Sequence, residues 1–249
     1  MGSIPITENK VVFCLFDGSG IAGQPWAEDG YTVYCFNADG GDHGKYPHKI
    51  VHPNIIYVDA WIEPGFDPVA EGYPVPNLII AFPPCTDMAV SGARHFKSKA
   101  EKDPDFQIKA ANVAKVAADL AEKYGSEYCI ENPVSVLSTL WRKCDYIFNP
   151  YEFGGYLPEN DQHPHYPEFI RGRDAYPKKT CLWVSEGFKF PEKLPVPVDD
   201  GFSTQYKKLG GKSQKTKTVR SLTPRGFARA VFQANRRGIH DKETGSVPS

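Results

Sequence analysis

The sequence predicts an α/β protein built on a doubly wound, mostly parallel β-sheet, and three observations support this class. Short, continuously apolar runs occur at 10–16 and 77–82, as in strands that are buried on both faces. Segment 105–124 carries alanine and apolar residues at three- and four-residue spacing, which is typical of a helix. Glycine, proline or acidic residues directly follow the strand-like runs. Strands that alternate with helices in this way indicate a parallel sheet with helices on its faces.

Each element is expected where the local sequence favours it. The strands after the first are rich in β-branched and aromatic residues, which suit a pleated surface, and are expected at 32–36, 54–58, 77–82, 127–130 and 180–184. Helices are expected at 23–29, 105–124 and 223–236. Gly125 is a suitable end for the second helix, and Pro224 suits the first turn of the third.

The amino-acid composition changes along the chain, which suggests regions of different structure. Its 249 residues, with a hydrophobic content of 41% and a charged content of 24%, suit one globular domain, or one domain with a small appendage. After about residue 150 the sequence becomes dense in Pro, Gly, His and aromatic residues without a clear period. We therefore expect a core over 1–150, a small irregular segment over 151–217, a closing helix packed on the core within 218–239 and a disordered tail over 240–249.

Charge and hydropathy limit the classes of partner and location. The net charge is -1, so the overall balance predicts neither nucleic-acid nor membrane binding, and a nucleic-acid partner would need a local basic patch. No signal-peptide pattern opens the sequence, and no apolar run approaches the roughly 20 residues that span a bilayer. These features predict a cytoplasmic protein without a membrane partner.

The spacing of cysteine and histidine predicts no metal site. None of the six cysteines lies in a CxxC pair, and their spacing matches no zinc-finger or zinc-ribbon pattern. His163, His165 and Cys181 could be imagined as ligands, but loop histidines outside such patterns are more often surface residues. Three other cysteines lie in apolar strand-like runs, where a buried, inert thiol is the usual state: Cys14, Cys35 and Cys129.

A glycine-containing turn follows the first expected strand. The sequence F-D-G-S-G at 16–20 would let the backbone turn tightly and approach a ligand at the carboxyl end of the sheet. Asp39, 22 residues after Asp17, could accept hydrogen bonds from a ribose, and Asp59 ends the third strand at the same edge. Because the third glycine is displaced to Gly23, a mononucleoside site is favoured over a dinucleotide site. The alternative is an ordinary turn with aspartates that cap helices.

A second constellation places a cysteine and a glutamate at strand ends. Cys85 follows the strand at 77–82 and two prolines, which make a stiff turn. Glu131 ends the strand at 127–130, so the two side chains enter one cleft if these strands are neighbours. The loop at 86–94 could close over a substrate. Taken singly, each residue is more readily explained as structural, but the ordered combination with the glycine turn favours catalysis.

A thiol and a carboxyl group at one site suit chemistry on a pyrimidine ring. Cytosine C5 is too weakly nucleophilic to take a methyl group directly, whereas a thiolate that adds to C6 makes C5 nucleophilic. A carboxyl group at N3 would stabilise the charge that this addition develops. A free thiol has a pKa of ~8.5, so nearby positive charge should assist Cys85. Basic residues close to it in sequence are Arg94, Lys97 and Lys99.

The chain resembles the DNA (cytosine-5) methyltransferases, especially short phage-type members. The resemblance spans most of the chain, and its matching segments occur in the family's order: LFDGSG (15–20), FPPC (82–85), IENP (130–133), KKTCLW (178–183) and RSLTPRGFARA (220–230). It implies a Rossmann-like class I methyltransferase fold, S-adenosylmethionine (SAM) as cofactor, and a bacterial or phage-infected cytoplasm as setting. The 1–150 core would then bind the cofactor, and 151–217 would recognise the target.

The resemblance also implies roles for individual residues. Cys85 would be the nucleophile, Glu131 would contact N3, and Lys178 would lie close to the target base. Phe16 would pack on adenine, and Asp59 would meet its edge. The full set of implied cofactor-binding residues is Phe16, Asp17, Gly18, Gly20, Asn37, Asp39, Asp59 and Pro83.

The sequence departs from the family pattern in four places. Asp17 stands where a small residue is common, Thr86 where glutamine is common, and Pro133 where valine is common. No clear copy of the last cofactor-contacting motif is present, and the helix expected at 223–236 would take its place.

DNA is the implied substrate, and the target cytosine must be flipped out of a duplex or lie in a single strand to reach a buried thiol. Basic residues among aromatics could bind phosphates and stack bases, or could form a solvated loop. Alternatives are a pyrimidine methylase acting on RNA or a free nucleotide, an alkyltransferase using modified SAM, and a catalytically inactive DNA-binding relative. The expected nucleic-acid contacts are Arg94, Lys97, Arg171, Arg173, Lys212, Lys217 and Arg220.

Overall fold

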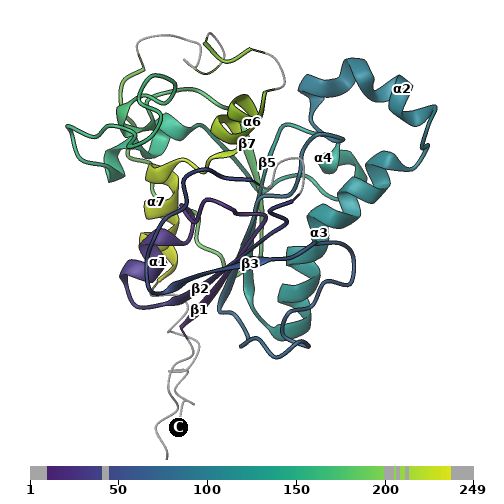
Figure 1. The fold of residues 1–249 in the computed structure, drawn as a ribbon, viewed down its shortest axis with the longest axis horizontal. Helices are drawn as coiled ribbons and strands as arrows, with labels where there is room; N and C mark the ends of the chain where they lie inside the picture. Colours follow the sequence, from purple (N-terminus) through teal and green to yellow (C-terminus); the bar gives the residue numbers. More distant parts are fainter. Residues whose placement is uncertain (1–9, 41–44, 199–204, 206–207, 211–212, 237–249) are drawn as a thin grey trace, which may run out of the picture.

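A computed structural model describes residues 10–40, 45–198, 205, 208–210 and 213–236 (Figure 1). One seven-stranded sheet forms its centre. The strands are β1 (Val11–Leu15), β2 (Thr32–Asn37), β3 (Ile55–Asp59), β4 (Leu78–Ala81), β5 (Glu127–Pro133), β6 (Tyr146–Phe148) and β7 (Thr180–Val184). The α-helices are α1 (Gln24–Glu28), α2 (Phe96–Ala100), α3 (Phe106–Tyr124), α4 (Leu137–Leu140), α6 (Gln214–Ser221) and α7 (Arg225–Asn235). The described residues also include the 3₁₀ helices η1 (Val90–His95), η2 (Pro150–Tyr156) and η3 (Gly172–Asp174).

The sheet has the order β3-β2-β1-β4-β5-β7-β6. Strands β1 to β5 pair in parallel, and their order 3-2-1-4-5 is that of a doubly wound Rossmann-like sheet. Strand β7 enters between β5 and β6 and is antiparallel to both. The expected fold class, an α/β protein with a doubly wound and mostly parallel sheet, is therefore confirmed.

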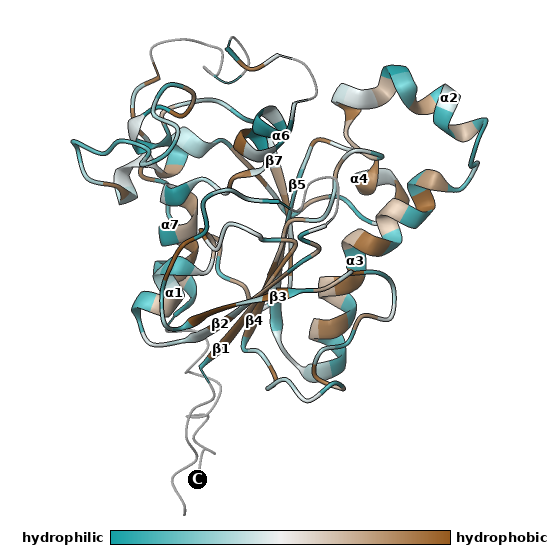
Figure 2. Cartoon of the chain, viewed as in Figure 1, coloured by the Kyte–Doolittle hydropathy of each residue, from teal (hydrophilic) through white to brown (hydrophobic). Residues whose placement is uncertain are grey.

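Helices cover both faces of the sheet. Alternate β1 residues point to opposite sides, so that Cys14 packs toward α1 and α7 while Phe13 packs toward α3. The continuous apolar run was expected for this reason, because a strand between two helical layers has no solvent-facing side. Figure 2 shows the hydrophobic strands at the centre, with α1 and α7 on one side and α3 on the other. Helix α3 ends at Gly125, which adopts the left-handed conformation with φ 70°.

The segment 151–217 supplies more than irregular loops. Its strand β7 belongs to the central sheet, so the sheet is completed by residues on both sides of position 150. Helix α6 was not expected; the Ser213 side chain caps it by accepting a hydrogen bond from the Thr216 amide. The segment also contributes Tyr166, Ile170 and Tyr176 to a small hydrophobic core, which Ile21 and Ala228 join from outside the segment.

The closing helix is present as α7, with Pro224 at its N-cap. Its first residue, Arg225, forms a paired ionic contact with Asp161 at 2.9 and 2.7 Å, which ties α7 to the segment 151–217. The tail expected at 240–249 lies outside the described residues. Across the described part of the chain, every helix is too short or too polar to span a bilayer.

Candidate active site

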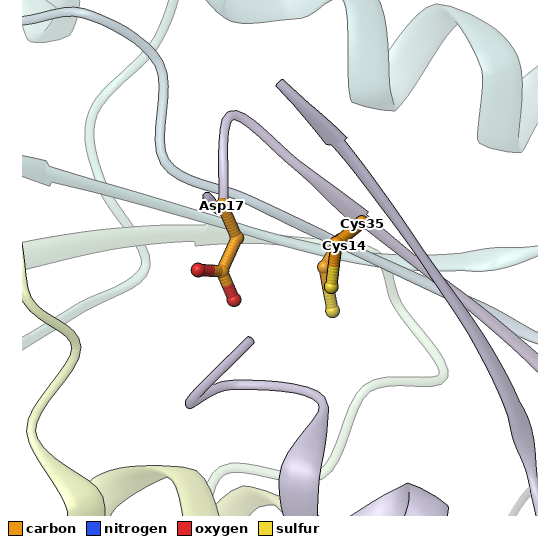
Figure 3. Close-up of side chains that lie close together, drawn as sticks. All are labelled: Cys14, Asp17 and Cys35. Atoms are coloured by element: carbon orange, nitrogen blue, oxygen red, sulfur yellow. The ribbon is translucent and has the colours of Figure 1, made fainter. Parts of the chain in front are cut away.

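The turn after β1 is held together from the inside by Asp17. This residue is buried, and its Oδ1 atom accepts hydrogen bonds from the Ser19 amide (2.8 Å), the Ser19 hydroxyl (2.7 Å) and the Gly20 amide (2.9 Å). Burial raises the pKa of Asp17, although these hydrogen bonds act in the opposite direction. Asp17 therefore fixes the shape of the turn by hydrogen bonds on its buried side. Figure 3 shows the Asp17 carboxylate directed toward the interior. Phe16 precedes it with an unusual positive φ of 60°.

Two glycines of this turn are required by close neighbours. A Cβ atom on Gly18 would lie 2.3 Å from Cδ2 of Tyr46, and one on Gly20 would lie 2.2 Å from the Tyr57 hydroxyl. Gly20 also has a φ of 77°, which favours glycine. Tyr46 is fixed from the other side because its hydroxyl lies 2.9 Å from the Ser221 hydroxyl. The sequence carried no signal for Tyr46, since a single loop tyrosine matches no motif.

The polar residues expected at the ends of β2 and β3 meet in one network. The Asn37 side chain donates a hydrogen bond to Asp39 (3.0 Å), and the Asp39 amide donates one to Asp59 (3.0 Å). Lys49, which sequence reasoning missed, contacts the other Asp39 carboxylate oxygen at 2.8 Å. Partial burial raises the pKa of Asp39, but Lys49 and Asn37 outweigh it and the pKa is lowered. An ionised acceptor therefore stands at this edge of the sheet.

Cys85 and Glu131 leave neighbouring strands at the same sheet edge. Strands β4 and β5 are parallel partners, with Ala81 opposite Ile130, and both residues follow that pair in the same direction. Burial raises the pKa of the Cys85 thiol, the charge of Glu131 raises it further, and Lys178 lowers it. Burial also raises the pKa of Glu131, again opposed by Lys178. Glu131 and Lys178 thus both act on the Cys85 thiol, and Lys178 also acts on Glu131, so the three side chains form one cluster.

Asn132 joins the two motifs directly. Its side-chain amide donates a 3.0 Å hydrogen bond to the Pro83 carbonyl, and the side chain is buried. Backbone contacts continue this connection: the Val90 amide donates to the Val134 carbonyl, and the Val136 amide donates to the Met88 carbonyl. The loop that carries Cys85 is therefore attached along its length to the segment after β5. Sequence reasoning noted the Glu-Asn-Pro motif but assigned no role to its asparagine.

Lys178 is positioned by residues from two other elements. Its amide donates a hydrogen bond to the Asn149 side chain (3.1 Å), and its ammonium group donates one to the Arg220 carbonyl at 3.0 Å. Arg220 lies in α6, and its own guanidinium donates a hydrogen bond to the Leu209 carbonyl at 2.7 Å. The end of α6 thus helps to place Lys178 beside Cys85 and Glu131.

The expected nucleic-acid contacts fall into two groups. Arg94 and Lys97 are exposed on η1 and α2, on the opposite side of the upper part of the molecule from α6 (Figure 1). In the other group, Arg173 is engaged within the protein, since its amide contacts Asp161 and its guanidinium contacts the Gly154 carbonyl. The remaining members are half-buried or exposed, apart from Lys212, which lies outside the described residues: Arg171, Lys217 and Arg220.

The expectation that His163 is a surface residue was wrong. His163 is buried, and its Nδ1 atom accepts a hydrogen bond from the Tyr166 amide at 3.0 Å. Burial lowers its pKa to about 4, so the ring is neutral. His165 instead stacks on His48, with ring centres 4.0 Å apart. His163 is therefore an interior residue, with its ring centre 5.5 Å from that of Tyr166.

Comparisons with known proteins give little further information. No protein-family model matches the chain, and no curated protein matches it. One solved structure from E. coli, provisionally described as a DNA modification methyltransferase encoded within a prophage, is similar with 14% sequence identity and a TM-score of 0.42. The similarity covers 75% of this chain and 52% of that one, so the chain spans about half the length of this relative.

Proposed function

We propose that this protein is a SAM-dependent methyltransferase that methylates cytosine C5 in DNA, with Cys85 as its nucleophile. The observation that carries the proposal is the cluster of Cys85, Glu131 and Lys178 at the carboxyl edge of adjoining parallel strands. Ligands of doubly wound sheets bind at this edge. The cluster supplies a nucleophile, an acid and a positive charge, which are the groups that addition to a pyrimidine ring needs.

The neighbouring strand ends suit a nucleoside cofactor. Asp39 presents an ionised acceptor for ribose hydroxyls at this edge of the sheet. The adjoining turn carries Gly18, where the Tyr46 ring and the Asn37 side chain leave no room for a Cβ atom. Phe16 stands at the start of this turn, and Asp59 is joined to Asp39 by a hydrogen bond. SAM would supply an electrophilic methyl group here. Pro83 would border the cofactor on the Cys85 side.

The chain's own residues would act in a defined order. The Cys85 sulfur forms a bond to cytosine C6, while Glu131, whose raised pKa favours its protonated form, donates a hydrogen bond to N3. Lys178 increases the thiolate fraction of Cys85. C5 would then take the methyl group from bound SAM, which would be left as the neutral thioether. Loss of the C5 proton to solvent and breakage of the sulfur–C6 bond, which returns the Cys85 thiolate, would then restore aromaticity. The exposed Arg94 and Lys97 would hold phosphates of the nucleic acid.

Transfer of radiolabelled methyl groups tests the proposal. The protein is incubated with labelled SAM and DNA, RNA or dCMP, beside the Cys85→Ala and Cys144→Ala variants. We expect label in DNA with the wild type and Cys144→Ala, because Cys144 is a half-buried thiol outside the cluster, and none with Cys85→Ala. A covalent complex with 5-fluorocytosine DNA should depend on Cys85 in the same way.

Other outcomes would replace the proposal. Label only in RNA or dCMP would assign a different pyrimidine substrate. Transfer that appears only with a modified SAM would assign an alkyltransferase. DNA binding without transfer or trapping, in protein that binds SAM, would assign an inactive relative. Undiminished transfer by Cys85→Ala would refute the role of the thiol.

A further inference from the structure

Two cysteines and one aspartate meet below the turn that follows β1. Cys14 and Cys35 are directly opposite each other in the parallel pair β1 and β2, so their side chains point to the same face of the sheet. Asp17 follows three residues after Cys14. The ligand atoms of all three lie within 4.8 Å of one another, and all three residues are buried. Figure 3 shows the two sulfurs side by side, with the Asp17 carboxylate extending to the same side of the strands.

The Asp17 carboxylate has one satisfied oxygen and one without a partner. Oδ1 receives the hydrogen bonds that hold the turn. Oδ2 is buried and has no partner with hydrogen-bond geometry in the described part of the chain, although the nearby Ala22 amide lowers the pKa of the carboxyl group. Asp17 is only 3% exposed, so bulk water cannot satisfy Oδ2. A buried acceptor without a partner is costly, and native proteins seldom leave one. A cation beside the two sulfurs would satisfy it.

Thiolates and carboxylates together form a ligand set for zinc. Zn²⁺ is bound in proteins by cysteine sulfur, histidine nitrogen and carboxylate oxygen, whereas Mg²⁺ and Ca²⁺ prefer oxygen ligands alone. We propose that Cys14, Cys35 and Asp17 form a buried site for one zinc ion beneath the turn. The inference is independent of the proposed methyl transfer.

Binding has a simple balance of bonds and protons. Two sulfur–zinc bonds and one oxygen–zinc bond form, and each thiol releases one proton to solvent. Two thiolates and one carboxylate carry three negative charges against the two positive charges of the ion, which leaves one negative charge on the site. Asp17 binds through Oδ2, so its Oδ1 atom can continue to hold the turn. The fourth coordination position would be taken by one water molecule enclosed together with the ion, since bulk water does not reach the site.

The site would attach three segments to one another. Cys14 lies in β1, Cys35 in β2, and Asp17 shapes the turn that carries Gly18 and Gly20. Because metal binding energy is gained only in the folded protein, zinc should stabilise this corner of the sheet against unfolding. The neighbouring Tyr57 hydroxyl shares its one proton between the Ile50 carbonyl (2.9 Å) and the Ser19 carbonyl (3.1 Å) and closes the same region.

Cobalt binding tests the site directly. The full chain is freed of metal with a chelator and titrated with Co²⁺, which gives a thiolate-to-cobalt charge-transfer absorption when cysteines bind it. We expect one equivalent to bind, the absorption to disappear when Zn²⁺ is added, and Zn²⁺ to raise the melting temperature. Cys14→Ser and Cys35→Ser should lose the absorption and the thermal shift. Asp17→Asn, which keeps Oδ1 for the turn, should weaken Co²⁺ binding.

The matched control is a second thiol pair. Cys144 and Cys181 interact through their thiols, but they are not part of a group of three metal-ligating residues in the described chain. Cys144→Ser should therefore keep both the absorption and the thermal shift. No charge-transfer absorption in the wild type, its persistence in Cys35→Ser, or its loss in Cys144→Ser would overturn the proposal. If the serine variants fail to fold, the wild-type titration and Asp17→Asn still decide it.

Discussion

The side chain of Asn132 donates a hydrogen bond to the main-chain carbonyl of Pro83 across the boundary between β5 and the loop after β4. Asn132 directly follows Glu131, and Pro83 lies two residues before Cys85. One buried contact thus fixes the separation of the two groups proposed for catalysis. A site of this kind loses efficiency when its groups are displaced by even about 1 Å.

Replacing Asn132 should affect turnover more than binding. Asn132→Ala removes the hydrogen bond to Pro83 and should cost about 1–2 kcal/mol of stability. We expect kcat for methyl transfer to fall at least about tenfold, with a smaller change in the KM for SAM. Asn54→Ala is the control, since the Asn54 amide donates a similar hydrogen bond to the Ala27 carbonyl far from the site. Equal kcat values for the two variants would contradict the positioning role.

Removing the Lys178 charge should make the Cys85 thiol less reactive. Lys178 lowers the pKa of Cys85 against burial and Glu131, so Lys178→Met should raise that pKa and reduce the thiolate fraction at neutral pH. The measurement is the rate of iodoacetamide labelling at Cys85 as a function of pH, followed by mass spectrometry. We expect Lys178→Arg to restore the rate and Lys179→Met to leave it unchanged. A pH profile of Lys178→Met that matches the wild type would refute the electrostatic role.

Gly20 should tolerate a methyl group less well than Gly30. Both have positive φ, 77° and 86°, so alanine is strained at each and should cost about 1–2 kcal/mol. Only Gly20 adds a collision, with the Tyr57 hydroxyl, whereas a Cβ atom on Gly30 meets nothing within 4 Å. Urea unfolding should therefore show a larger loss of unfolding free energy for Gly20→Ala than for Gly30→Ala. Equal losses would mean that the turn moves to relieve the contact.

Burial of His163 should make stability depend on pH. Its pKa is about 4 in the folded protein, mainly through burial, with Arg225 and His165 lowering it and Asp161 and Glu168 raising it. The unfolded chain, with a histidine pKa near 6.5, binds the proton more readily. Above about pH 6.5 this histidine is neutral in both states and does not change the free energy of unfolding. As pH falls from about 6.5 toward 4, its protonation in the unfolded chain lowers that free energy by about 2–3 kcal/mol.

His163→Asn isolates this contribution. The asparagine oxygen can accept the Tyr166 hydrogen bond but does not titrate, so urea unfolding between pH 7 and 4.5 should lose part of its pH dependence. His52→Asn is the control, because His52 also accepts a backbone hydrogen bond through Nδ1 but is only half-buried. We expect His52→Asn to keep the wild-type dependence of the unfolding free energy on pH. If His163→Asn keeps it as well, burial of His163 is not its cause.

The parts of the fold that the sequence predicted depend on local patterns. The apolar run at 10–16 correctly predicted a strand, and the apolar spacing within 105–124 correctly predicted a helix. Each pattern arises because one element is buried along its own length. β6 has only three residues, two of them exposed, and so carries no such pattern. Helix α6 is polar, with basic residues throughout, and its capping serine is a weak signal in isolation.

The candidate site was predicted only where motifs name its residues. Cys85 and Glu131 stand at the ends of strong strands, so their common edge followed from the expected parallel sheet. The contacts of Asn132, Lys49 and Tyr46 are different, because each joins segments that lie apart in sequence. The Cys14–Cys35 pair is a further case. Each cysteine suited an ordinary buried strand, and only the register of β1 against β2 brings both sulfurs beside Asp17.

Because β7 lies between β5 and β6, the strands of the sheet cannot pair in the order in which they are synthesised. During synthesis β5 and β6 emerge before β7, yet β6 pairs only with β7 in the described sheet. The growing polypeptide must therefore keep the β5 edge open until residues 180–184 leave the ribosome. A fragment that stops near residue 150 would expose an unsatisfied strand edge, a known route to self-association. The protein should accordingly become protease-resistant only after its second half has been made.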